Sequence, residues 1–290
     1  MNRKEFLVRT ASGIVGIGVA GCSAPALRTA PEKTAPLTYG TLGKTGLKVT
    51  GVGFGATRTD QPSVMKRVVD LGVNFIDTGR MYAGGRNEEL IGKVVRDIRK
   101  DIVLQSKFHR KLHDDPKAIE HSIEESLKAL KTDYIDIMLY RWPESPEQLR
   151  SPAVEKAFAR AKEKGTIRFG GFSCHENQAV MIGAALEAGF YDVALVAYNH
   201  AGNYIHPQSK RFYEWDQAAL EIELGKAVER GMGIVAMKSC AGGPRKEQGE
   251  SAPTYTASLR WLLENDLVDA SVPAMANFRQ VEEDVRAMEV

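Results

Sequence analysis

The sequence contains few cysteines, and none of them form a pair at the spacing of a metal or redox motif. Only Cys22, Cys174 and Cys240 occur in 290 residues. Three thiols are too few for a disulfide framework or a four-thiolate centre, so no metal site is predicted. Charge of one sign is also lacking, because 39 Lys and Arg residues stand against 37 Asp and Glu residues. Without a basic stripe, the chain is not expected to bind nucleic acid.

A hydrophobic run long enough to span a bilayer is missing as well. The apolar stretch at residues 11–20 is about half the ~20 residues that a membrane-spanning helix needs. It follows a basic start and ends in small residues, which is typical of an export signal. The letters RKEFL at residues 3–7 resemble a twin-arginine signal, and VAGC at residues 19–22 resembles a bacterial lipobox in which Cys22 is acylated.

We therefore expect an export signal at residues 1–22, a flexible tether at residues 23–36, and a periplasmic protein. Lipidation of Cys22 would hold it on a membrane as a lipoprotein. The alternative is ordinary signal cleavage near residues 24–26, which would discard Cys22 and leave no anchor.

From residue 37 to residue 290, short apolar runs alternate with helical patterns and predict one α/β domain. Strands are expected at Val49–Phe54, Val73–Asp77, Ile102–Ser106, Ile135–Tyr140, Ile167–Phe172, Val193–Tyr198, Gly233–Lys238 and Ala270–Pro273. Helices are expected near residues 62–71, 88–99, 116–130, 153–164, 178–188, 220–230, 254–264 and 278–288. Nearly continuous apolar strands indicate a parallel sheet covered on both faces.

Eight such units, with no G-x-G-x-x-G after the first strand, favour a closed (β/α)8 TIM barrel over an open doubly wound sheet. The letters GKTG at residues 43–46 predict an N-terminal β-hairpin that caps the barrel. Two long stretches without predicted structure, residues 199–216 and 241–253, follow the sixth and seventh strands. In a barrel they would lie at the C-terminal end, where active sites are built.

Polar residues at the ends of the predicted strands are the candidate catalytic groups. Asp77 ends the second strand, Tyr82 follows in the loop, and Lys107 ends the third. An ammonium group at Lys107 beside Tyr82 would stabilise the phenolate and make the phenol a usable general acid. Asp77 would keep the lysine charged. A Schiff-base role for Lys107 is the alternative, and the Asp77 and Tyr82 context argues against it.

Several motifs in order along the chain resemble the aldo-keto reductase family. They are LGKTGLKV at residues 42–49, GVNFIDTGRMY at 72–82, NEELIG at 87–92, SK at 106–107, YIDI at 134–137, WP at 142–143, GFS at 171–173, YN at 198–199, VP at 272–273 and NFRQVEE at 277–283. The resemblance implies a (β/α)8 barrel that binds NADP(H) without a Rossmann motif and reduces aldehydes or ketones. Asp77, Tyr82 and Lys107 fall on three of the four catalytic positions of the family.

The fourth catalytic position departs from the family pattern, because Arg141 stands where a histidine is usual. A guanidinium group is a permanent donor and cannot relay a proton. It can orient a carbonyl oxygen and would favour a substrate with a carboxylate. The alternative is a salt bridge to a nearby acid such as Glu144, with no part in catalysis.

The resemblance also implies which residues bind the cofactor and the substrate. The residues expected to bind NADP(H) are Ser173, Met237, Lys238, Asn277, Arg279, Gln280 and Glu283, and those expected to line the substrate pocket are Trp142, Tyr204 and Trp215. Met237 as core packing and Lys238 as an ordinary rim charge are the alternatives. By the same resemblance, Cys174 and Leu195 stand where relatives have polar residues, so fewer groups remain to bind the carboxamide of the nicotinamide ring.

Together these features predict an NADP(H)-dependent oxidoreductase that reduces an aldehyde or ketone with Tyr82 as general acid. The alternative is a non-catalytic barrel that binds a nicotinamide or another ligand, suggested by Arg141, Cys174 and Leu195.

Overall fold

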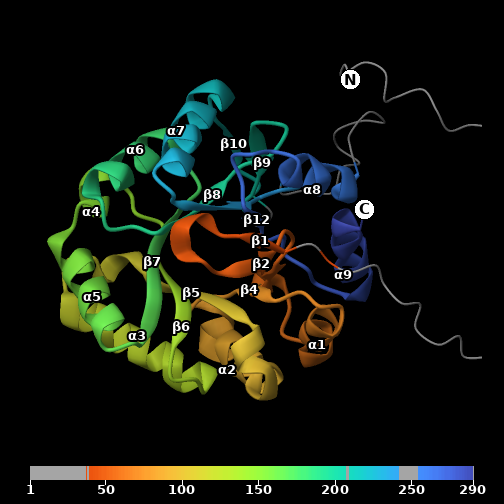
Figure 1. Cartoon of the computed structure of the whole chain (residues 1–290), viewed down its shortest axis with the longest axis horizontal. Coiled ribbons are helices and arrows are strands. Elements are labelled where there is room, and N and C mark those ends of the chain that lie inside the picture. Colours follow the sequence, from red (N-terminus) through yellow and green to blue (C-terminus); the bar gives the residue numbers. More distant parts are fainter. Residues whose placement is uncertain (1–36, 38, 207–208, 242–253, 290) are drawn as a thin grey trace, which may run out of the picture. The chain divides into compact units, whose positions relative to one another are not determined.

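Eight parallel strands form a single sheet that closes into a barrel (Figure 1). The computed structural model describes residues 37, 39–206, 209–241 and 254–289, all of them within the unit Ala35–Val290. The strand order is β12-β11-β8-β7-β6-β5-β4-β3. Bridges from Val52 to Ser271 and from Gly55 to Ala274 join the two ends of the sheet. The predicted (β/α)8 barrel is therefore confirmed.

The eight barrel strands lie close to the predicted apolar runs. They are β3 (Phe54–Gly55), β4 (Phe75–Asp77), β5 (Val103–His109), β6 (Ile135–Arg141), β7 (Ile167–Cys174), β8 (Val193–Ala197), β11 (Gly233–Met237) and β12 (Ala270–Ser271). Every neighbouring pair that the structure describes is parallel.

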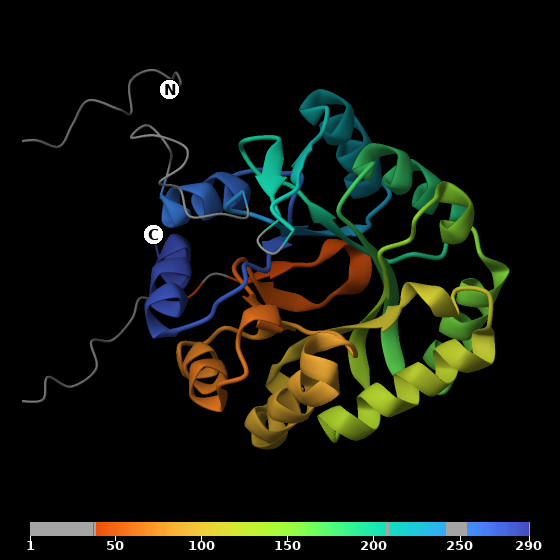
Figure 2. The same ribbon diagram turned by 180° about the vertical axis from the view of Figure 1, so that it is seen from behind.

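The helices surround the sheet on its outer side, as both views show (Figures 1 and 2). They are α1 (Pro62–Asp70), α2 (Arg86–Val94), α3 (Pro116–Leu130), α4 (Pro146–Leu149), α5 (Pro152–Glu163), α6 (Gln178–Ala188), α7 (Gln217–Glu229), α8 (Tyr255–Leu263) and α9 (Phe278–Val285), with short 3-10 segments η1 (Gly43–Thr45), η2 (Ala56–Arg58), η3 (Tyr82–Gly85), η4 (Arg96–Asp101), η5 (Arg110–Leu112) and η7 (Arg286–Met288). Side chains cap the starts of α3, α5, α7, α8 and α9; at α3, for example, the Asp115 carboxylate accepts from two amides. None of the helices among the described residues is long and apolar enough to cross a membrane.

A hairpin of β1 (Tyr39–Thr41) and β2 (Lys48–Thr50) covers the N-terminal end of the barrel, as predicted from the GKTG turn. The prediction of one strand over Val49–Phe54 was wrong in part, because Val49 and Thr50 pair with β1 and the barrel strand begins at Phe54. Gly53 lies at this change of direction. A Cβ there would come within 2.8 Å of the Phe75 carbonyl oxygen, so only glycine lets the chain pass so close.

Side chains alternate between the two faces of each strand, and this divides the apolar core into two layers. Val103 on β5 points into the barrel, where it belongs to a cluster with Leu42 of the hairpin. Leu104 and Phe108 point outward into the larger cluster between sheet and helices. Because side chains alternate with a period of two, Lys107 shares the inward face of β5 with Val103.

The stretch after β8 contains a second hairpin, which the sequence analysis missed. Strands β9 (Asn203–Ile205) and β10 (Phe212–Glu214) pair antiparallel within residues 199–216. Tyr204 and Tyr213 lie opposite each other, and their rings stack with centroids 4.8 Å apart. This aromatic cross-strand pair stabilises so short a hairpin.

Candidate active site

The inward-facing positions at the C-terminal ends of the strands hold four polar side chains. Asp77 ends β4, Lys107 lies near the end of β5, Arg141 ends β6, and Ser173 is the next-to-last residue of β7. The register pairs Lys107 with Leu139 and Arg141 with Ser173, so they all share one end of the barrel. In a (β/α)8 barrel this is the end where catalytic groups collect.

Asp77 and Lys107 form a buried ion pair at the centre of this end. The Lys107 ammonium group donates to the Asp77 carboxylate and, at 2.6 Å, to the Thr78 carbonyl oxygen. Gln105 donates a further hydrogen bond to Asp77, at 2.7 Å. The side chains of Lys107 and Asp77 are 3% and 8% exposed, so the pair is held away from water. Each buried charge therefore has a partner, as its burial requires.

Tyr82 lies against this ion pair from the loop after β4. The Lys107 Nζ atom is 5.0 Å from the centroid of the Tyr82 ring. Burial alone would lower the pKa of Lys107, but the charges and hydrogen bonding of Asp77 and Tyr82 outweigh burial and raise it above 10.5. Lys107 is thus an ammonium group throughout the neutral range. The structure brings Asp77, Tyr82 and Lys107 together as the sequence predicted.

Arg141 lies on the next strand and forms no salt bridge with Glu144. That carboxylate pairs instead with Arg110, at 3.1 Å. Within the described part of the chain, the Arg141 guanidinium group has no ion pair and no hydrogen bond, and its central carbon lies 5.7 Å from the centroid of the Trp142 ring. The expected alternative of an Arg141–Glu144 bridge is therefore wrong.

Trp142 has a backbone conformation that is uncommon for a bulky residue. Its φ is 56°, in the left-handed region, and its amide donates to the Ser173 carbonyl oxygen at 2.8 Å. The indole ring packs against the imidazole of His175, with centroids 5.0 Å apart. Strained residues of this kind cluster at functional sites, which agrees with the expected place of Trp142 in the pocket.

The predicted pocket residue Tyr204 lies on β9 of the second hairpin and is buried, with 1% of its surface exposed. Its hydroxyl lies 3.5 Å from the Nδ1 atom of His175, and the Lys238 Nζ atom lies 5.3 Å from its ring centroid. Trp215 packs beside Tyr204 and donates to Gln217 at 2.8 Å. Tyr204 therefore contacts both His175 and Lys238, and Trp215 packs against Tyr204.

Lys238 follows β11 in a left-handed conformation with φ of 60°. Burial, and then the charge of Arg58, lower its pKa from 10.5 to about 8. Among the described residues no carboxylate pairs with it. Met237 precedes it and packs on the apolar cluster inside the barrel. A partly buried cation without an anion is suited to a phosphate group.

The residues predicted to bind the adenosine end of a cofactor lie at the start of α9. The Asn277 side chain accepts from the Gln280 amide at 3.0 Å, and the Gln280 side chain accepts from the Ala276 amide at 2.7 Å. Arg279 is exposed and has no ion pair within the described residues, and Glu283 is partly buried. Because β11 pairs with β12, and bridges join the ends of the sheet at β12 and β3, Lys238, the start of α9 and Arg58 occupy one sector of the barrel end.

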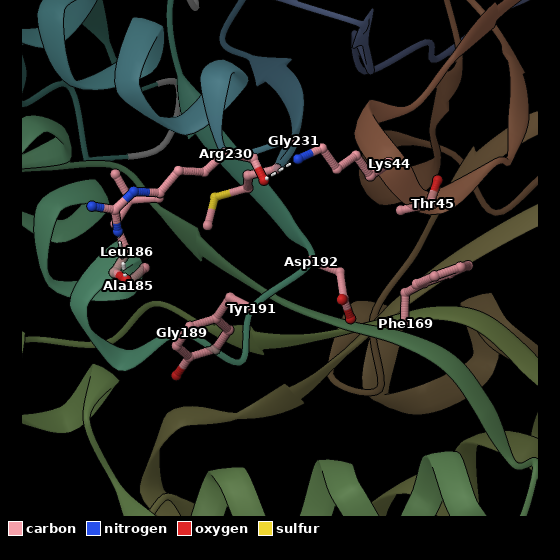
Figure 3. Close-up of a pocket in the computed structure, with 11 residues that line it drawn as sticks. Lys44, Thr45, Phe169, Ala185, Leu186, Gly189, Tyr191, Asp192, Arg230 and Gly231 are labelled. Atoms are coloured by element: carbon pink, nitrogen blue, oxygen red, sulfur yellow. Dashed lines mark hydrogen bonds between the residues drawn. The ribbon is translucent and has the colours of Figure 1, made fainter.

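A cavity of about 390 Å³ lies at the opposite, N-terminal end of the barrel (Figure 3). Its lining includes Lys44 of the hairpin and Arg230 at the end of α7, with Asp192 before β8. The Asp192 carboxylate is already bound by Lys162 at 2.6 Å and by the Gly170 amide at 2.9 Å. This cavity is separate from the candidate active site, and Asp192, the one carboxylate in its lining, is already paired.

Two residues of the site were not singled out from the sequence. Gln105 donates a hydrogen bond to Asp77. The sequence could have indicated this residue, because it lies two positions before Lys107 and therefore faces the same side of the strand. His175 was not among the residues predicted from the sequence. Burial, and then the charges of Lys238 and Arg141, hold its pKa well below 6.5, so its imidazole is neutral.

Some predicted features lie outside the described residues. They are the export signal, Cys22, the tether, and residues 242–253 of the loop after β11.

Comparisons with known proteins give one consistent family. The model of the aldo/keto reductase family matches residues 41–251. An uncharacterized oxidoreductase of Bacillus subtilis, YqkF, is 32% identical over 146 residues. The match covers 46% of this chain and 47% of the relative, so the chain spans about half the length of such curated relatives. The holo form of aldo-keto reductase AKR11C1 from Bacillus halodurans superposes with a TM-score of 0.72 at 22% identity, covering 88% of this chain and 92% of that one. An aldo/keto reductase of Klebsiella pneumoniae in complex with NADP and acetate gives 0.68 at 21% identity, covering 87% and 90%.

Proposed function

This chain belongs to the aldo/keto reductase family, and on that premise we propose that it is an NADP(H)-dependent oxidoreductase that reduces an aldehyde or ketone. The observation that carries the proposal is the cluster of Asp77, Lys107 and Tyr82 at the C-terminal end of the barrel. A buried ammonium group beside a phenol stabilises the phenolate that forms when the phenol gives up its proton.

The donor set at the barrel end suits a phosphate-bearing dinucleotide. Lys238 and Arg279 are cations without an anionic partner among the described residues, and α9 directs its N-terminus to the same sector. The similar protein from Klebsiella pneumoniae is in complex with NADP. NADPH, when bound, supplies the hydride.

The chain's own residues then handle the proton. Tyr82 donates its proton to the carbonyl oxygen as negative charge develops there. Lys107 stabilises the resulting phenolate, and Asp77, held by Gln105, keeps the ammonium group in place. Met237 lies at the inner edge of the site and offers an apolar surface to a nicotinamide ring.

The test is NADPH oxidation by the full chain with a panel of aldehydes, in parallel with a fluorescence titration of NADPH and NADH. Tyr82→Phe removes the acid, and we expect kcat to fall by about 100-fold or more while NADPH still binds. Tyr39→Phe is the matched control, because its hydroxyl only binds the Gly72 carbonyl oxygen, at 2.9 Å, near the N-terminal end of the barrel.

Two results would change the proposal. If neither nicotinamide binds, the reductase function fails. If NADPH binds but no carbonyl is reduced at a rate that Tyr82→Phe and Arg141→Ala change, the chain is a binding barrel without catalysis.

We also propose that the protein is exported and anchored through an acylated Cys22. Support comes from the basic start, the short apolar stretch and the VAGC motif. Cell fractionation with mass spectrometry of the N-terminus tests this, and Cys22→Ala is expected to release the protein from the membrane fraction. An unprocessed cytoplasmic chain would refute it.

A further inference from the structure

We infer that Arg141 binds a carboxylate of the substrate, so that the site prefers oxo acids to uncharged aldehydes and ketones. The inference rests on the proposed function and names its substrate class.

The first support is the isolation of the Arg141 charge. The side chain is partly buried at the inner rim, and none of the described residues gives it an ion pair or a hydrogen bond. A charge taken partly out of water without a partner is unfavourable. A bound anion would compensate it.

The second support is that the acids of this rim are already engaged. Asp77 is bound by Lys107 and Gln105. Glu144 pairs with Arg110 at 3.1 Å, and Glu176 pairs with Arg211 at 3.4 Å. Arg141 is therefore an available cation whose neighbouring carboxylates serve other residues.

The third support is the positive charge of the groups around this part of the site. His175 packs on Trp142, and the charges that lower its pKa after burial are those of Lys238, Arg141, His206 and Lys107. The groups that act on this imidazole are thus all basic. Such surroundings attract an anion and reject a cation.

The position of Arg141 also suits a small substrate. His109 pairs with Arg141 in the register of β5 and β6, and Lys107 lies two residues before His109 on the same inward face. From the strand spacing and the rise per residue, the Cα atoms of Lys107 and Arg141 are about 8 Å apart. A carbonyl group beside Tyr82 and a carboxylate at Arg141 therefore fit within one small molecule.

The chemistry of the side chain favours a carboxylate. The planar guanidinium group offers two parallel N–H groups that match the two oxygens of a carboxylate. Phosphate is the other anion that arginine binds, so the experiment includes a phosphate ester.

The experiment measures kcat/KM of the full chain with NADPH for matched pairs of substrates. The pairs are pyruvate and 2,3-butanedione, succinate semialdehyde and butanal, and 4-carboxybenzaldehyde and 4-methylbenzaldehyde, with glyceraldehyde 3-phosphate and glyceraldehyde as the phosphate pair. We expect at least one acid to be preferred over its uncharged counterpart by about 10-fold or more.

Variants then assign the preference to one residue. In Arg141→Gln the ratio of acid to uncharged substrate should fall by about 10- to 100-fold, mainly through KM, and Arg141→Lys should recover part of it. Arg110→Gln is the matched control, because Arg110 lies 5.5 Å from the same Trp142 ring but already pairs with Glu144. It should change the ratio by less than about threefold.

Equilibrium binding separates this inference from the proposed function. Calorimetric titrations of 4-carboxybenzyl alcohol and benzyl alcohol, with and without NADP+, need no turnover. Tighter binding of the acid that is lost in Arg141→Gln supports the inference even if no carbonyl is reduced, in which case only the reductase function fails. Turnover without a preference for any acid, a preference for the phosphate ester alone, or a ratio that Arg141→Gln leaves unchanged would overturn it.

Discussion

A buried carboxyl group on α9 makes the stability of the barrel depend on pH. Asp284 is 6% exposed, and within the described residues its side chain has neither a hydrogen bond nor an ion pair. Burial, and then the charge of Glu283, raise its pKa from 3.8 to about 7. The folded chain therefore keeps a proton that the unfolded chain loses between these two values, so stability falls as the pH rises from about 4 to about 7 and stays low above it.

The substitution Asp284→Asn should remove this penalty. A pKa difference of about three units at about 1.4 kcal/mol each sets an upper limit of about 4 kcal/mol, and water penetration reduces it to about 2 kcal/mol or more. We expect the variant to be more stable than the parent at pH 8, with a melting midpoint higher by about 4 to 8 °C, and to differ little at pH 4.

Thermal unfolding followed by circular dichroism, on the full chain without added cofactor, measures this effect. Asp133→Asn is the control, because Asp133 is exposed and the same change there should alter stability by less than about 0.5 kcal/mol. A variant that is less stable at pH 8, or a difference that is the same at pH 4 and pH 8, would refute the account of Asp284.

Three further predictions concern the scaffold. Arg99→Ala should lower the free energy of unfolding by about 3 kcal/mol or more in a denaturant titration, because Arg99 binds the buried Asp136 at 2.8 Å. A loss as small as that of an exposed ion pair would contradict this. Gly43→Ala should lower the melting midpoint, since φ is +47° and a Cβ would lie 2.5 Å from the Gly233 amide nitrogen. We expect a loss of about 2 kcal/mol or more, and an unchanged midpoint would show that the hairpin does not cap the barrel tightly. Burial raises the pKa of the Cys174 thiol, so iodoacetamide should alkylate Cys174 only after unfolding, and mass spectrometry that finds it modified in the native chain would disprove that.

Much of the barrel could be predicted because its strands are apolar on both faces. The run Ile135–Tyr140 becomes β6 (Ile135–Arg141), and both of its faces are buried, one in the barrel and one under helices. Hydrophobicity does not predict the strand boundaries where one apolar run contributes residues to two different strands. Val49 belongs to the hairpin and Phe54 to the barrel, and their hydrophobicity alone cannot show the bend between them.

The site was predictable to the extent that position on a strand decides it. Asp77 ends β4 and Lys107 lies near the end of the neighbouring β5, both on the inward face, which alternation and topology dictate. The partner of Glu144 was not predictable, because Arg110 and Arg141 both reach the Trp142 ring and only the folded backbone decides which of them pairs. The same applies to the burial of Tyr204, which depends on the β9–β10 hairpin and on the packing of Tyr213 and Trp215 against its ring.

The guanidinium group at position 141 affects the charge of this end of the barrel. Lys107 is a fixed cation, but Asp77 compensates it, so this pair contributes almost no net field to the rim. Within the described residues no carboxylate pairs with Arg141, so its guanidinium group adds an uncompensated positive charge to this end of the barrel. That charge also helps to keep His175 neutral, because a second cation beside it would be repelled. Under the proposed function, the preference for oxo acids and part of the shift that keeps His175 neutral both come from this one side chain, and the proton for the carbonyl oxygen comes from Tyr82.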